Sequence, residues 1–337
     1  MRTTIRDLAR LSGVSTSTVS RVLTGNPHVS QDVREKVANA ISQTGFVPNG
    51  NARGLQQKKR NIFAVVVPQG YNTYYDEIVK GINKIADSSG INIILVSQNE
   101  NARRSTIERI LEIGVDGIIH MGALENDSIV PMLKSTETPF VMLCRDHDID
   151  ADKILFDDLS AGKQITSYLL SLGHRKLAYI YGDKASKSSK YKYDGFISAL
   201  KEHNLEPDIN AVTEGGLTSD GGYLAMRELL KRRKDGKTTF TAVVAGNDIM
   251  MFGARKAILE EGLIIPKDLS IAGMDDIFWS GVSGLELTTV NSPKIEMGEK
   301  AVTMLLERIK NPDRPSRTLV LDTRLVIRKS CSSPLNG

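Results

Sequence analysis

Polar side chains suited to binding hydroxyl groups follow several short apolar runs of this sequence. Asn247 comes directly after the run TAVVAG, Asp275 follows LSIAGM, and Asp157 opens the segment DDLSAG. An amide and a carboxylate at neighbouring strand ends can share the hydroxyls of a polyol, because each oxygen accepts one O–H. For Asp157 and Asp248, capping of the following helix is an equally good interpretation. The pattern therefore predicts a polyol-binding cleft around Asn247 and Asp275.

The sequence offers little support for catalysis. The motifs GxGxxG, GxxxxGK[ST], GxSxG and HExxH do not occur, and the five histidines form no i, i+4 pair. His174 is expected to tether a turn, and Cys144 to be a small residue at a strand end rather than a nucleophile. Asp275 and Asp276 could suggest paired acid–base carboxylates, but no base, nucleophile or metal ligand lies nearby in the sequence. We therefore expect a binding protein without enzymatic activity, metal or cofactor.

A second group of polar side chains lies on a predicted helix near the N-terminus. Apolar residues recur at helical spacing in residues 4–23, and Gly13 stands where a left-handed helix end would need it. Ser15 can cap the second of two short helices. The outward face of that helix is cationic and rich in hydroxyls: Thr16, Ser17, Ser20 and Arg21. This arrangement predicts a helix-turn-helix whose second helix reads DNA, although an ordinary helical hairpin would show the same spacing.

The distribution of charge also indicates nucleic-acid binding at the N-terminal end of the chain. Residues 1–60 contain ten Lys or Arg and three Asp or Glu, whereas the remaining 277 residues contain 34 and 37. Binding to a polyanion is therefore expected in the N-terminal sixth. Two distant cysteines fit a reducing compartment, and charged residues interrupt any signal peptide. No stretch approaches the apolar length of a membrane span, so we expect a cytoplasmic protein without a membrane partner.

A third helix completes a small N-terminal domain. Ser30 can cap a helix over residues 31–44, and Gly45 can end it. Residues 1–46 are therefore predicted to form a three-helix headpiece. The following residues 47–60 contain proline, two glycines and several basic side chains, which makes a basic linker the simplest interpretation.

The rest of the chain shows the sequence pattern of an α/β protein. Apolar runs such as IFAVVVP and INIILVS alternate with helical patterns, and the alternation starts again at KLAYIYG. Buried strands that alternate with helices predict parallel, doubly wound sheets. Residues 61–330 are therefore predicted to form two doubly wound α/β subdomains that face each other across a cleft. Residues 331–337 are polar and are predicted to form a flexible tail. The sequence contains no leucine heptad that would predict a tetramerising coiled coil.

The motifs together resemble a known family. VSTSTVSRVLTGNPHVSQDVREKV followed by GFVPNGNARGL resembles the start of the LacI/GalR family of bacterial transcriptional repressors. LGHRKLAYI, YDGF, AVVAGNDIMMFGA, IPKDLSIAGMDD and LTTVNSPKIEMGEKA continue in that family's order. The resemblance implies a homodimeric repressor that binds a pseudo-palindromic operator. It also implies a periplasmic-binding-protein-like core that holds a small-molecule effector, such as a sugar, between its subdomains.

Two alternatives remain at this point. The effector could act as a corepressor rather than an inducer. The same core could also belong to a sugar-binding transport protein or a sugar-modifying enzyme. The basic residues 1–60 argue against the transport protein, and the missing motifs argue against the enzyme.

The resemblance also implies which residues contact DNA. It implies a hinge helix within residues 47–60 that forms on the operator, with Leu55 pressed into the minor groove. The full set of expected DNA contacts is Thr4, Ser15, Thr16, Ser17, Ser20, Arg21, Asn49, Ala52, Arg53 and Leu55.

For the effector, the resemblance implies contacts from Tyr74, Tyr75, Asp157, Lys192, Asn247 and Asp275. Three positions depart from the family pattern: Lys192 replaces a forked arginine, Leu217 an aromatic residue, and Cys144 a carboxylate. Lys184, Lys187 and Lys190 lie near Lys192 in KASKSSKYKYD. A solvated basic loop explains these lysines, and an acidic or phosphorylated sugar effector is the sharper alternative.

Overall fold

The computed structural model contains two compact units, residues 1–60 and residues 61–337. The residues that it describes are 3–23, 25–46, 60–68, 73–98, 103–122, 129–144, 146, 149–284 and 286–334.

The described part of the first unit is helical. Its helices are α1 (Ile5–Ser12), α2 (Thr16–Leu23) and α3 (Gln31–Thr44). At the start of α2, Ser15 Oγ accepts a hydrogen bond from the Thr18 amide at 3.1 Å. Gly13 and Gly45 adopt the left-handed conformation, with φ of +66° and +60°, and end α1 and α3. The predicted third helix is confirmed at both ends, although the Ser30 side chain makes no capping hydrogen bond.

A small apolar core holds the three helices together. Leu8, Val19 and Val37 come from different helices and are all fully buried. The loop after α2 is held by Arg34, whose Nε donates a hydrogen bond to Val29 O at 3.2 Å and whose guanidinium also binds Asn26 O. These contacts fix α2 on the other two helices and leave its opposite face exposed.

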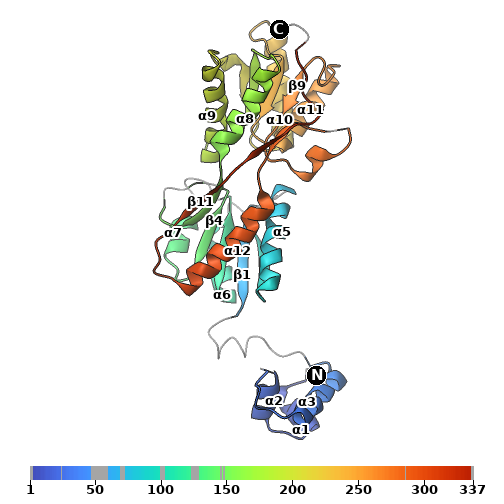
Figure 1. Cartoon of the computed structure of the whole chain (residues 1–337), viewed down its shortest axis with the longest axis vertical. Coiled ribbons are helices and arrows are strands. Elements are labelled where there is room, and N and C mark those ends of the chain that lie inside the picture. Colours follow the sequence, from blue (N-terminus) through green and yellow to red (C-terminus); the bar gives the residue numbers. More distant parts are fainter. Residues whose placement is uncertain are drawn as a thin grey trace. The chain divides into compact units, whose positions relative to one another are not determined.

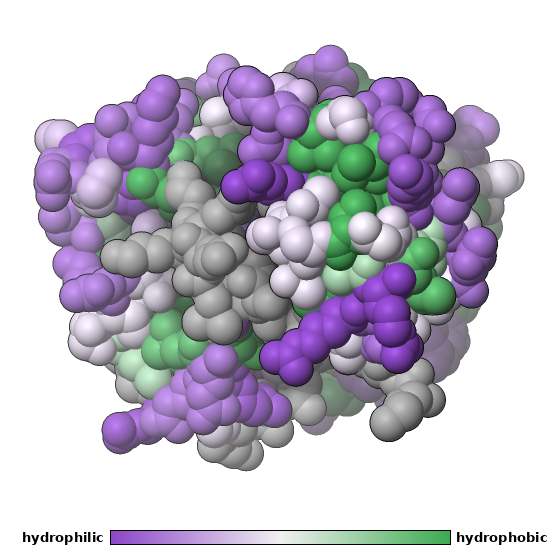
Figure 2. All heavy atoms as spheres, turned by 90° about the horizontal axis from the view of Figure 1, so that it is seen from below, coloured by the Kyte–Doolittle hydropathy of each residue, from purple (hydrophilic) through white to green (hydrophobic). Residues whose placement is uncertain are grey.

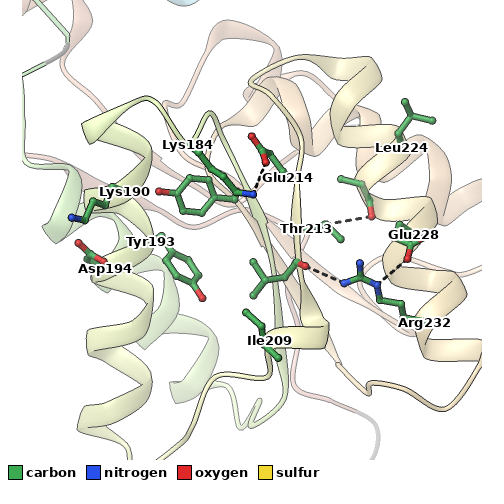
Figure 3. A pocket seen from close by; sticks show the side chains of 13 residues that line it. Lys184, Lys190, Tyr193, Asp194, Ile209, Thr213, Glu214, Leu224, Glu228 and Arg232 are labelled. Atoms are coloured by element: carbon green, nitrogen blue, oxygen red, sulfur yellow. Dashed lines mark hydrogen bonds and ion pairs between the residues drawn. The ribbon is translucent and has the colours of Figure 1, made fainter. Parts of the chain in front are cut away.

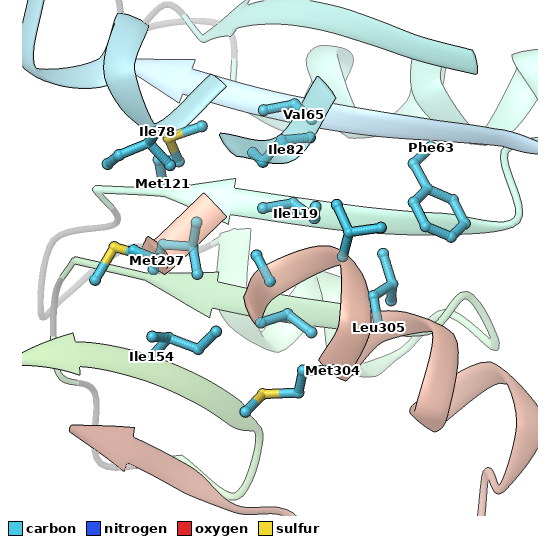
Figure 4. Close-up of a cluster of buried hydrophobic side chains, with 14 of the residues drawn as sticks. Phe63, Val65, Ile78, Ile82, Ile119, Met121, Ile154, Met297, Met304 and Leu305 are labelled. Atoms are coloured by element: carbon cyan, nitrogen blue, oxygen red, sulfur yellow. The ribbon is translucent and has the colours of Figure 1, made fainter. Parts of the chain in front are cut away.

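The first subdomain of the core contains a six-stranded parallel sheet in the order β11-β5-β4-β3-β1-β2. Its strands are β1 (Ile62–Pro68), β2 (Asn92–Gln98), β3 (Gly117–Met121), β4 (Phe140–Leu143), β5 (Asp152–Phe156) and β11 (Thr318–Leu321). Helices α5 (Thr73–Ser88) and α12 (Lys294–Lys310) cover one face (Figure 4), and α6 (Arg103–Ile113) and α7 (Ile129–Lys134) cover the other. Because both faces of the central strands β1, β3 and β4 are buried, these strands are almost continuously apolar.

The second subdomain repeats this design on a smaller scale. Its parallel sheet has the order β7-β6-β8-β9. The strands are β6 (Leu177–Tyr181), β7 (Val212–Glu214), β8 (Ala242–Ala245) and β9 (Ser270–Ala272). Helices α8 (Asp158–Ser171) and α9 (Lys187–Glu202) pack on one face, and α10 (Ser219–Lys234) and α11 (Asp248–Glu260) on the other. Short 3₁₀ helices, η2 (Ile209–Ala211) and η3 (Phe278–Gly281), lie in its loops.

The chain passes between the subdomains three times (Figure 1). It leaves the first subdomain after β5, returns before α12, and leaves again after β11. The antiparallel pair β10 (Thr289–Asn291) and β12 (Arg324–Val326) joins two of these crossings. The predicted pair of α/β subdomains is therefore observed, with connections drawn from three distant parts of the sequence.

Helices in each layer approach each other closely at glycines. On α5, a Cβ at Gly81 would collide with the backbone carbonyl of Ile295 on α12. Reciprocally, a Cβ at Gly298 on α12 would collide with the carbonyl of Ile78 on α5. The pairs α8–α9 and α10–α11 show the same reciprocal contact, at Gly162 with Gly195 and at Gly222 with Gly253. Backbone contact on both sides makes each helix pair a stiff unit.

The end of the described chain corrects one prediction. Residues 331–334 are not a flexible tail, because they pack along β9. Cys331 Sγ donates a hydrogen bond to Ile271 O at 3.2 Å, and the Ser332 amide donates one to Ser270 Oγ at 3.1 Å. The tether expected of His174 is confirmed, since its ring lies 2.7 Å from Thr241 Oγ1 and 2.9 Å from Ser332 O.

Among the described residues, no helix is both long and apolar enough to cross a bilayer. The face of the molecule in Figure 2 is mostly hydrophilic, with smaller apolar areas between the polar side chains.

Candidate functional site

A cavity of about 100 Å³ lies between the two subdomains, where strands end and helices begin. The first subdomain contributes Tyr74 and Tyr75 from the start of α5 and Cys144, which follows β4. The second subdomain contributes Ser186, Ser188, Ser189, Lys192, Leu217, Asn247, Ile249 and Asp275. The amino ends of helices carry partial positive charge, so this position favours ligand oxygens.

Asp275 offers one carboxylate oxygen to this cavity. The residue is buried and has a φ of +114°, which is uncommon for a residue other than glycine. Its amide donates a hydrogen bond to Val290 O at 2.9 Å, which ties the strained backbone to β10. Oδ1 accepts a hydrogen bond from Lys192 Nζ at 3.0 Å. Oδ2 accepts none from the residues that the structure describes, so it can accept the hydroxyl of a ligand.

Asn247 has a double position, as a helix cap and as part of the cavity wall. Its Oδ1 accepts a hydrogen bond from the Met250 amide at 2.8 Å and so begins α11. Its Nδ2 donates a long hydrogen bond of 3.4 Å to Leu217 O. The protein therefore orients the amide group at the wall of the cavity.

Lys192 is engaged by the protein rather than held ready for a ligand charge. Besides Asp275 Oδ1, its Nζ binds Gly246 O at 3.1 Å and lies 3.9 Å from Asp158 Oδ1. Burial alone would lower the pKa of Lys192, but the two carboxylates outweigh burial and raise it. The ammonium is therefore charged and balanced by Asp275 and Asp158.

Two buried carboxyl groups near Lys192, those of Asp158 and Asp248, have raised pKa values. Burial raises the pKa of Asp158 to about 6, although Lys192 and a hydrogen bond from Ser188 oppose the shift. Burial also raises the pKa of Asp248 to about 7, with a contribution from the Asp275 charge. Both carboxyl groups therefore bind a proton more readily than exposed carboxyl groups do.

Tyr74 and Tyr75 form an aromatic wall opposite these polar groups. Their rings meet edge to face at a centroid distance of 5.1 Å, and Tyr74 also packs on Phe156 of the first-subdomain core. Both rings line the cavity, and both also pack against the core of the first subdomain.

Two of the aspartates considered from the sequence serve as structural groups. Asp157 does not line the cavity; its Oδ1 accepts a hydrogen bond from the Ser160 amide at 2.9 Å and caps α8. The capping interpretation is therefore confirmed, and the effector contact expected of Asp157 stays a prediction. Asp248 accepts hydrogen bonds from Thr289 Oγ1 at 2.7 Å and from the Ile277 amide at 3.2 Å, which fixes the loop after Asp275.

The lysine-rich segment before α9 contributes serines to the cavity. Ser186, Ser188 and Ser189 line it, whereas Lys184 and Lys190 line a different cavity. These serines were not predicted as ligand contacts, because the lysines between them dominate the character of the segment. Their spacing at the predicted amino end of a helix, next to a strand end, was the signal available.

That other cavity is larger, about 910 Å³, and lies between α9 and α10 along β7 (Figure 3). Its charged groups neutralise one another: Lys184 lies 2.9 Å from Glu214, and Arg232 lies 2.9 Å from Glu228. It belongs to one subdomain alone. The smaller cavity between the subdomains joins five of the six expected effector contacts and is the candidate effector site. The described residues contain no cluster suited to a metal ion.

The exposed face of α2 presents the expected donors. Thr16, Ser17 and Arg21 are exposed and Ser20 is half-buried. Thr4 is engaged in the capping box of α1, where its Oγ1 donates a hydrogen bond to Asp7 Oδ2 at 2.7 Å. Ser15 caps α2. Four further expected contacts lie outside the described residues: Asn49, Ala52, Arg53 and Leu55.

Comparison with known proteins identifies the family. Residues 4–49 match the profile described as bacterial regulatory proteins of the lacI family. Residues 61–329 match the profile of periplasmic binding proteins and sugar binding domains of the LacI family. The ribose operon repressor of Haemophilus influenzae is 32% identical over 332 residues, which cover 98% of this chain and 99% of that protein. The chain belongs to the LacI family.

Solved structures of LacI-family proteins agree with this assignment. The Lac repressor dimer bound to operator and an anti-inducer has a TM-score of 0.87 and 27% identity, covering 98% of this chain and 100% of its own. An Enterococcus faecium LacI-family regulator with bound ribose has a TM-score of 0.72 and 29% identity, covering 81% and 99%. This LacI-family chain is therefore a DNA-binding transcriptional regulator controlled by a small molecule, and not an enzyme.

Proposed function

We propose that this LacI-family repressor binds an uncharged sugar of one ring in the cavity between its subdomains. The observation that supports this proposal best is the pairing of Lys192 with Asp275 at 3.0 Å. This pairing occupies the cation that an acidic or phosphorylated sugar would need. The remaining polar groups of the cavity include one carboxylate oxygen, one amide, three serine hydroxyls and two tyrosine hydroxyls, which suit the hydroxyl groups of a ligand.

The size of the cavity limits the ligand further. Its volume is about 100 Å³, below the roughly 300–1,000 Å³ of pockets that enclose drug-sized ligands. A single sugar ring therefore suits it better than an oligosaccharide. A sugar ring stacked on Tyr74 or Tyr75 would turn its hydroxyls toward Asn247 and Asp275. The bound ribose in the Enterococcus faecium relative supports the same class of ligand.

For DNA, we propose that a homodimer binds a pseudo-palindromic operator in the cytoplasm. Thr16, Ser17, Ser20 and Arg21 would face the major groove. Residues 47–60 would form the hinge, with Leu55 in the minor groove. We favour an inducer, which releases operator, over a corepressor. The Lac repressor structure, a dimer on operator, supports this assembly.

A thermal-shift screen tests the ligand class directly. D-ribose and D-glucose would be compared with ribose 5-phosphate and glucose 6-phosphate. A ligand present at 100 times its Kd stabilises the folded protein by about 2.7 kcal/mol. We expect a neutral sugar to raise the melting temperature of the wild type but not of Asn247→Ala. Asp194→Asn, which changes the larger cavity, is the matched control and should respond like wild type. The proposal would be contradicted if only the sugar phosphates, and neither neutral sugar, raised the melting temperature.

A further inference from the structure

Lys294 is fully buried at the start of α12, directly behind Asp275. Its Nζ donates hydrogen bonds to the carbonyls of Asp275, of Asp276 at 3.1 Å and of Ser292 at 3.2 Å. It also lies 3.5 Å from Glu77 Oε2 on α5. A buried ammonium is tolerated only where such partners surround it, so this position is built for the charge.

These partners belong to different subdomains. Glu77 and the start of α12 belong to the α5–α12 pair, which packs on the first-subdomain sheet. The two helices are in close backbone contact at Gly81 and Gly298. The Asp275 and Asp276 carbonyls belong to the loop after β9 in the second subdomain. Nζ of Lys294 therefore joins the two subdomains at one point.

That point adjoins both walls of the effector cavity without lining it. Asp275 presents its backbone carbonyl to Lys294 and its carboxylate to the cavity. On the other side, the Tyr74 ring lies 6.0 Å from Lys294 Nζ and faces the cavity from α5. A change in the angle between the subdomains must therefore break or remake the hydrogen bonds of Lys294.

We propose that Lys294 is a positioning residue that holds the Asp275 backbone on the α5–α12 pair and so keeps the cleft closed. Its relevance to the effector rests on the function proposed above. Closure itself is a property of the protein alone, and it can be tested without any sugar. Failure of the sugar screen and failure of this proposal are therefore separate results.

The two cysteines of the chain provide the readout. Cys144 lines the cavity, so opening of the cleft should expose it to a thiol reagent. Cys331 packs against β9, where burial raises its pKa to about 11 and slows its reaction. Iodoacetamide labelling of full-length protein, followed by peptide mass spectrometry, gives a rate for each cysteine.

We expect Lys294→Met to accelerate labelling of Cys144 by about tenfold or more, since minor open states are commonly populated at about 0.1–10%. The rate at Cys331 should stay as in wild type. Glu77→Gln removes the charge that Lys294 meets on the first subdomain and should accelerate labelling of Cys144 by a smaller factor. Lys84→Met is the matched control, because Lys84 joins α5 to α12 through an exposed ion pair with Glu299 at 2.6 Å. It should change neither rate.

Two results would overturn the proposal. One is a wild-type rate at Cys144 in both Lys294→Met and Glu77→Gln. The other is faster labelling of both cysteines in Lys294→Met together with wild-type labelling rates in Glu77→Gln. That result would mean that Lys294 stabilises the fold in general and does not hold the cleft closed. If Lys294→Met does not fold, Glu77→Gln decides: acceleration at Cys144 alone supports the proposal, and no acceleration refutes it.

Discussion

Replacing Lys192 by methionine should destabilise the protein, because it removes the cation between two buried carboxylates. Lys192 Nζ lies 3.0 Å from Asp275 Oδ1 and 3.9 Å from Asp158 Oδ1, and all three side chains are about 10% exposed. Methionine keeps most of the side-chain length without the charge. Removing one partner of a buried ion pair costs about 3–5 kcal/mol. We expect a loss of about 3 kcal/mol at pH 8.

The loss should depend on pH in a defined direction. Burial raises the pKa of Asp158 from 3.8 to about 6, and Lys192 opposes this shift. Without Lys192 the folded-state pKa should rise further. A carboxyl group with a raised folded-state pKa binds its proton more tightly when folded, so stability increases as pH falls through that pKa. The Lys192→Met variant should therefore recover part of its stability between pH 8 and pH 5.

Urea unfolding followed by circular dichroism at pH 8 and pH 5.5 measures both effects. Lys184→Met is the control, because Lys184 forms an exposed ion pair with Glu214 and its side chain is 76% exposed. Such surface pairs contribute about 0–1 kcal/mol. If Lys192→Met were as stable as Lys184→Met at pH 8, the ion pair would not be what balances Asp275.

Three further predictions concern other parts of the molecule. Asp158→Asn should abolish the part of the stability profile that falls as pH rises from about 4 to 6, because the titrating group with the raised pKa is gone; unfolding at several pH values measures this. Gly298→Ala should destabilise the core by about 1–3 kcal/mol, since its Cβ would collide with the Ile78 carbonyl, and calorimetry checks this. Arg21→Ala should reduce preference for the selected operator over random DNA in binding assays, and equal losses on both would contradict the role of α2.

The sequence predicted best those features that depend on neighbouring residues. The ends of the headpiece helices follow from Gly13, Ser15 and Gly45, whose backbone preferences act locally. Alternation of strands and helices likewise predicted the parallel sheets of the core. Asn247 and Asp275 could be placed at one cavity because parallel strands bring their carboxyl ends to the same edge.

Features that depend on distant partners were not predictable in this way. The carboxylate that binds Lys192 is 83 positions away, so the sequence did not indicate the ion pair with Asp275. Asp157 could equally be a ligand contact or a cap, and only the folded chain shows that it caps α8. Lys294 follows a proline, so its sequence position predicts only an ordinary helix start. In the folded chain its buried ammonium donates hydrogen bonds to the carbonyls of Asp275 and Asp276, which come from a distant loop.

The most direct test of the effector cavity measures operator binding with and without the sugar found in the thermal-shift screen. Operator fragments would be selected from genomic DNA by the purified repressor, and their affinity measured for wild type, Asp275→Asn and the control Asp194→Asn. We predict that the sugar weakens operator binding by wild type and by Asp194→Asn. In Asp275→Asn the sugar concentration required should rise about ten- to a hundredfold, because a hydrogen bond to a charged group contributes about 1.5–3 kcal/mol. An unchanged response of Asp275→Asn would contradict the assignment of this cavity.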